Sequence, residues 1–110
     1  MKTLIEYFSK QGVLFKSLNK VDKTLLNTRK KISIYTATDI KKNYYSIFKI
    51  EQKSRFLIKN SLEIEELDSR LQRLENHNFK YKHLIIGKTI CSKASNYLKE
   101  RGWDINHDLV

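Results

Sequence analysis

The residues with the clearest chemistry lie in one alternating stretch, YYSIFKIEQKSRF, at positions 44–56. Because successive residues of a β-strand point to opposite faces, Lys49, Lys53 and Arg55 share one side and form a row of cations. The planar fork of an arginine suits phosphate or carboxylate groups. This row predicts an anion-binding surface. The alternative is an exposed sheet face whose cations keep it soluble and guard it against edge pairing.

Two further groups of cations extend this prediction. The sequence Gly87-Lys88-Thr89-Ile90-Cys91-Ser92-Lys93 places the start of a helix directly after an apolar run. Free amides and a partial positive charge at a helix N-terminus attract anions, and Lys88 and Lys93 would strengthen that attraction. The cluster Arg29-Lys30-Lys31 precedes another predicted strand, where it is either a solvated loop or a phosphate contact.

Cys91 has two interpretations at this corner. In the first turn of a helix and beside cations, its pKa would be lowered and the thiolate could act as a nucleophile. Alternatively, it simply packs as a small side chain. The local GKT lacks a glycine five residues before Gly87, which excludes a Walker-type NTPase. The three histidines have no metal-ligand spacing with Cys91, so no zinc site is predicted.

Composition favours a polyanionic partner. The chain has a formal net charge of +10, and a basic domain attracts nucleic acid by releasing counterions from the phosphates. Tyr44 and Tyr45 would add stacking surfaces for bases. An A/T-rich coding sequence would also enrich Lys and deplete Pro and Gly, so composition alone leaves both explanations open. An acidic partner protein would suit the same charge.

The length of 110 residues predicts one domain, covering residues 1–110. No apolar run approaches the roughly 20 residues that span a bilayer, and the N-terminus lacks the features of an export signal. We therefore expect no membrane contact. The single cysteine, Cys91, fits a reducing cytoplasm.

The pattern of apolar residues predicts the elements that position these groups. Residues 31–40 and 44–56 alternate around turn residues and form an antiparallel hairpin, with Ile32, Ile34, Phe48 and Ile50 on its core face. Asn60 is expected to cap a helix. The other expected elements are a helix at 4–11, a strand at 13–15, a helix at 61–75, a strand at 82–87 and a helix at 90–101.

The helix at 61–75 buries a stripe of Ile64, Leu67, Leu71 and Leu74, which are spaced three and four residues apart. Because a helix connects the third and fourth strands, these two strands should be parallel. Trp103 should fold back onto the core. The prediction is a small α/β domain, ordered helix-strand-strand-strand-helix-strand-helix, with a mixed sheet and helices on both faces.

This order, with Glu51-Gln52-Lys53 at the end of the third strand, resembles the PD-(D/E)xK nuclease superfamily. The resemblance implies that Asp39 and Glu51 hold a divalent metal, such as Mg²⁺, while Lys53 steers the attacking water. It also implies a peripheral acidic role for Glu6 on the first helix. The register is a separate expectation: a turn centred near Lys42 would place Asp39 about 20 Å from Glu51.

Together these observations predict a nucleic-acid-binding protein whose nuclease-like fold carries either an intact or a degenerate metal site. The predicted binding surface combines Lys49, Lys53, Arg55, Lys88 and Lys93. The alternative is a non-enzymatic interaction module that binds an acidic protein, or that forms a homodimer through the helix at 61–75.

Overall fold

The computed structural model describes residues 8–10, 12–22, 32–50, 55–76, 78–86 and 90–106. Within these ranges, the elements alternate as the sequence predicts, with an additional short strand at the end. They are β1 (Phe15–Val21), β2 (Ile32–Asp39), β3 (Tyr44–Ile50), α2 (Ile58–Glu75), β4 (Tyr81–Ile86), α3 (Ser92–Glu100) and β5 (Trp103–Asn106).

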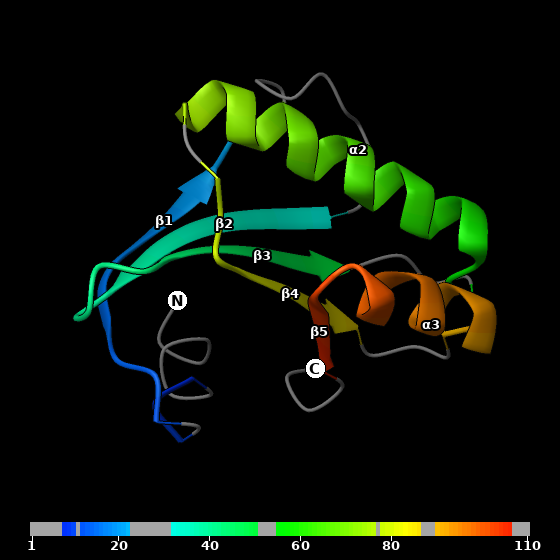
Figure 1. Ribbon diagram of the computed structural model, residues 1–110, viewed down its shortest axis with the longest axis horizontal. Helices are drawn as coiled ribbons and strands as arrows, with labels where there is room; N and C mark the ends of the chain where they lie inside the picture. Colours follow the sequence, from blue (N-terminus) through cyan, green and yellow to red (C-terminus); the bar gives the residue numbers. More distant parts are fainter. Residues whose placement is uncertain are drawn as a thin grey trace.

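The described strands form one mixed sheet in the order β1-β2-β3-β4-β5 (Figure 1). The β1–β2 and β2–β3 pairs are antiparallel, whereas β4 is parallel to both β3 and β5. The predicted crossover is confirmed, because α2 connects the parallel strands β3 and β4. Consequently β3 and β4 end at the same edge of the sheet, where β2 begins.

The hairpin register differs from the predicted one by two residues. Ile32 pairs with Ile50 and Thr38 with Tyr44, so the turn centres on Lys41 and not on Lys42. Lys42 adopts the left-handed conformation, with φ of 68°, which allows this tighter reversal. Because side chains alternate with a period of two, a shift of two residues leaves each one on its predicted face.

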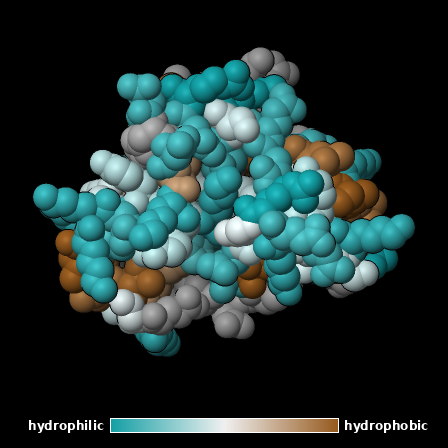
Figure 2. All heavy atoms as spheres, viewed as in Figure 1, coloured by the Kyte–Doolittle hydropathy of each residue, from teal (hydrophilic) through white to brown (hydrophobic). Residues whose placement is uncertain are grey.

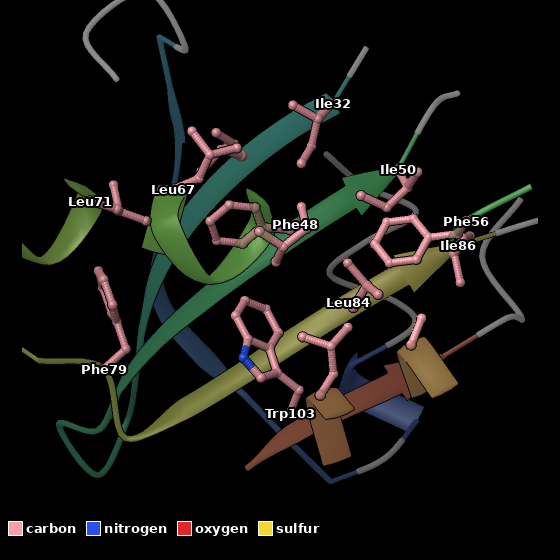
Figure 3. Close-up of a cluster of buried hydrophobic side chains, with 14 of the residues drawn as sticks. Ile32, Phe48, Ile50, Phe56, Leu67, Leu71, Phe79, Leu84, Ile86 and Trp103 are labelled. Atoms are coloured by element: carbon pink, nitrogen blue, oxygen red, sulfur yellow. The ribbon is translucent and has the colours of Figure 1, made fainter. Parts of the chain in front are cut away.

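One face of the sheet carries the main core (Figure 3). The predicted core face is confirmed, because Ile32, Ile34, Phe48 and Ile50 all belong to this cluster. Both α2 and α3 pack here, and Trp103 is buried with its ring 5.5 Å from that of Phe48. The buried members of the cluster are Val21, Ile32, Ile34, Phe48, Ile50, Phe56, Ile64, Leu67, Leu71, Phe79, Leu84, Ile86, Ala94, Leu98 and Trp103.

The opposite face is also buried, by a smaller and more aromatic cluster. Tyr35, Ala37, Tyr45, Ile47 and Ile85 form it together with Phe8, which is completely buried. Phe8 lies in the helical residues 8–10, the described end of the helix predicted at 4–11. The sheet is therefore covered on both faces, which explains why both sides of the hairpin are apolar.

The long helix differs from its prediction at its start and in the burial of Leu74. It begins at Ile58, with Leu57 as the N-cap residue; Asn60 caps from inside the helix, its side chain accepting a hydrogen bond from the Leu57 amide at 2.8 Å. At the other end Leu74 is exposed, because the helix extends past the edge of the core. The helix ends at Glu75, as predicted, and Asn76 after it adopts the left-handed conformation.

Candidate nucleic-acid interface

Asp39 is held in the turn between β2 and β3. Its Oδ1 accepts hydrogen bonds from the backbone amides of Lys41 (2.8 Å) and Asn43 (2.9 Å), and its Oδ2 accepts them from the Asn43 side chain (3.1 Å) and the Tyr45 hydroxyl (3.0 Å). Burial raises the pKa of Asp39, but these hydrogen bonds outweigh it and hold the pKa below its ordinary value. Asp39 is therefore an ionised carboxylate that closes the turn.

This geometry does not suit a metal ligand. A carboxylate has about four lone-pair sites, and the hydrogen bonds to Asp39 occupy that number. Asp39 ends β2, whereas Ile50, the last residue of β3, pairs with Ile32 at the start of β2. At the usual rise, these two ends of β2 are about 23 Å apart. The structure thus does not bring Asp39 to the end of β3.

The other predicted site residues of the nuclease motif, Glu51, Lys53 and Glu6, lie outside the described residues. No group of three His, Cys, Asp or Glu side chains in the described part of the chain is placed to hold a metal ion. At the start of β2, the residue facing Lys49 is Ser33. A metal-binding role for Glu51 stays a prediction.

The edge where β3 and β4 end brings two helix starts together. Phe56 and Ile90 form a parallel bridge beyond the two strands, and the Cys91 amide donates a hydrogen bond to the Phe56 carbonyl at 3.0 Å. The residue before this bridge is Arg55, and the first turn of α3 contains Lys93. Both cations are exposed. The sequence analysis assigned both cations to one binding surface, and this bridge joins the two segments that carry them.

The Cys91 thiol reports the positive potential at this corner. The backbone amide of Ala94 lowers the pKa of Cys91, and so do the amide of Lys93 and the charges of Arg55 and Lys93; burial opposes them. The hydrogen bond from Cys91 to Phe56 places Arg55 one residue before its acceptor and Lys93 two residues after its donor. Cys91 is half-buried and serves as the N-cap residue of α3, so its helix position is as predicted.

The remaining predicted cations fall into two groups. Lys49 is half-buried, pairs with Ser33 and Ile85, and lies on the aromatic face of the sheet near the same edge. The predicted contacts Arg29, Lys30, Lys31 and Lys88 are outside the described residues, so their roles stay predictions.

The two tyrosines that the sequence offered as stacking surfaces differ sharply. Tyr45 is 5% exposed, and its ring packs between those of Phe15, Tyr81 and His83. Burial, the hydrogen bond to Asp39 and its charge raise the pKa of Tyr45, which keeps the hydroxyl protonated as a donor. Tyr45 is therefore structural, and the stacking role proposed for it is wrong. Tyr44, in contrast, is 43% exposed.

The surface is largely hydrophilic in the view of Figure 2. Hydrophobic side chains gather there in two places, near the β2–β3 turn and near the start of α2. Ile40 at the turn is 63% exposed, and Leu62 in α2 is 51% exposed. Among the described helices, none has the length and apolar character needed to cross a bilayer.

Comparison with known proteins bears on the fold. No protein family and no characterised protein sequence matches the chain. EndoMS in its apo form matches with a TM-score of 0.59 and 14% identity, over 96% of this chain and 42% of that one. A repair endonuclease from Pyrococcus abyssi matches with a TM-score of 0.52 and 8% identity, over 83% of this chain and 38% of that one.

The fold is similar to those of EndoMS and of a repair endonuclease. At these identities the similarity concerns the fold alone, and the chain spans less than half the length of either protein. The topology expected from the order of strands and helices is therefore shared with a repair endonuclease, as the resemblance implied.

Proposed function

We propose that this protein binds nucleic acid along the edge of the sheet where β3 and β4 end. Arg55 and Lys93 would contact the phosphate backbone. Lys49 would support them, as would Lys53 and Lys88, whose places on this surface are predicted from the sequence. The observation that carries the proposal is the bridge between Phe56 and Ile90, because it joins the segments that carry Arg55 and Lys93, which a whole helix and a strand separate in the sequence.

Three further observations support this edge. Ligands of open sheets tend to bind beyond the carboxyl ends of parallel strands, and β3 and β4 are parallel. The start of α3 directs backbone amides toward the same corner, which favours an anion. The net charge of +10 would draw a polyanion toward the molecule over a longer range.

Binding, and not hydrolysis, is the function that the described residues support. The Mg²⁺ ion implied by the PD-(D/E)xK resemblance does not fit Asp39, whose lone pairs are occupied and which lies at the opposite end of the hairpin. Metal-dependent cleavage through Glu51, Lys53 and Glu6 is a separate prediction. Nicking of supercoiled DNA with Mg²⁺ or Mn²⁺, abolished in Glu51→Ala but not in Asp39→Asn, would establish it.

The binding proposal is tested by fluorescence anisotropy with labelled single-stranded and duplex oligonucleotides over a series of salt concentrations. Affinity should fall steeply as salt rises, because counterions compete for the phosphates. A flat response or no binding would contradict the proposal. The interaction-module alternative would then predict a fixed stoichiometry with an acidic protein, or a homodimer, in light scattering.

A further inference from the structure

A cavity lies on the main core face, away from the edge described above. It has a volume of about 620 Å³ and is bounded by β1, β2 and the C-terminal end of α2. The cavity exists because the buried stripe of α2 stops at Leu71: Leu74, one turn later, is 46% exposed and no longer covers the sheet. In Figure 1, this end of α2 lies beside β1.

The floor of the cavity carries uncharged hydrogen-bonding groups. Ser17 pairs with Thr38, and Asn19 pairs with Thr36, so the four side chains form two adjacent rows across β1 and β2. Hydroxyl and carboxamide groups can each donate and accept. The second row continues to Ser46, which is completely buried and whose hydroxyl has no hydrogen-bond partner in the described structure.

The first row continues to an aromatic side chain. Thr38 pairs with Tyr44, which lines the cavity and is 43% exposed. Leu74 and Phe79 provide apolar walls. A concave site of a few hundred cubic ångströms with apolar walls and a few convergent polar groups is typical of small-ligand binding. An exposed aromatic ring beside neutral donors and acceptors suits a flat ring whose edge is polar.

We propose that this cavity binds an unpaired nucleobase of the nucleic acid, an inference that rests on the proposed function. Tyr44 would stack on the base, while Asn19, Thr36 and Thr38 would bond its edge. A base within a duplex is stacked and paired, so the preferred ligand is single-stranded. Asp22 and Glu75 also line the cavity, so the cavity suits the uncharged base and not its phosphates.

Free nucleosides test the site without the phosphate backbone. Backbone amide shifts of the ¹⁵N-labelled full chain should move saturably around Tyr44 and Asn19 when at least one of adenosine, guanosine, cytidine or thymidine is added. Tyr44→Ala should weaken this binding about tenfold, whereas Tyr44→Phe should retain it because the ring remains. Asn19→Ala should also weaken it, and Asn96→Ala, an exposed asparagine of α3, should not.

A second arm compares a single-stranded oligonucleotide with one of the same length that lacks its bases. The abasic strand should bind about tenfold more weakly, and Tyr44→Ala should remove that difference. If no nucleoside shifts the cavity residues, or if both strands bind wild type equally well, the nucleobase proposal is wrong while backbone binding stands. If nucleosides occupy the cavity but no oligonucleotide binds, the proposed function fails and the base site remains.

Discussion

Charged residues have opposite roles at the two ends of the β2–β3 hairpin. At the turn, both oxygens of the Asp39 carboxylate accept hydrogen bonds, from its own loop and from Tyr45. At the other end, Ile32 and Ile50 close the strands, and the exposed cations Arg55 and Lys93 lie beyond β3 and β4. One end is internally satisfied, and the other presents charge to solvent.

This difference shows that a residue's chemistry depends on which end of an element it occupies. An acid at the turn satisfies the backbone amides of the reversal, which would otherwise need water or another partner. Arg55 and Lys93 are exposed cations beyond two parallel strands, so they are suited to an external anion. We therefore expect changes at the turn to affect stability and changes at the open edge to affect binding.

Phe48→Ala should have the largest effect and should erase the contrast between the two ends. Phe48 is completely buried in the central strand and packs against Trp103. A cavity there should lower the free energy of unfolding by about 3–5 kcal/mol. Urea denaturation measures this change. A loss below about 1 kcal/mol would contradict the assignment of Phe48 to the main core.

Tyr45→Phe should sharpen the comparison at the turn. The substitution removes the hydroxyl that donates to Asp39 while keeping the ring in the aromatic cluster. We expect a loss of about 1.5 kcal/mol in the free energy of unfolding, because a hydrogen bond to a charged group is lost. Oligonucleotide affinity should be unchanged. A weakened affinity with normal stability would show that the turn end takes part in binding.

His83 should give the smallest effect, a pH dependence on the aromatic face. Its side chain is buried against Phe8 and Tyr45, and its Nδ1 lies 3.8 Å from a carboxylate oxygen of Asp104. Burial lowers the pKa of His83, while the charge of Asp104 opposes this. The unfolded chain then binds more protons, so stability should fall as pH drops below about 6.5 toward the folded-state pKa.

Urea midpoints measured from about pH 7.5 down to about pH 5 test this dependence. Asp104→Asn should make the fall steeper, because the opposing carboxylate is gone. His83→Phe should reduce the slope in this window. An unchanged slope in His83→Phe would show that other groups cause the pH dependence.

Much of the fold follows from local patterns in the sequence. The alternation of residues 32–39 and 44–50 identified the hairpin and its core face, and the helical connection identified the parallel pair. In contrast, β1 was largely missed because FKSLNKV spaces its apolar residues by three, and the register shift between Phe15 and Ser17 interrupts the alternation. The exposure of Leu74 depends on where the sheet ends, which helix periodicity does not report.

The candidate site was predictable only in part. Arg55 and Lys93 were assigned to one surface, but the contact that joins their segments is the bridge between Phe56 and Ile90, which no local pattern reveals. Asp39 was singled out as the acid that the nuclease resemblance implies, although the same position suits a turn cap. Ser17 and Asn19 gave no signal, because their importance comes from their register with Thr38 and Thr36.

The salt dependence of oligonucleotide affinity in matched charge-removal variants tests the central claim most directly. Arg55→Ala/Lys93→Ala removes two cations from the open edge, whereas Arg73→Ala/Lys99→Ala removes two from the last turns of α2 and α3. The first pair should reduce the slope of log affinity against log salt by about 2, and the second should leave it unchanged. Equal slopes in the two double variants would contradict binding at the edge where β3 and β4 end.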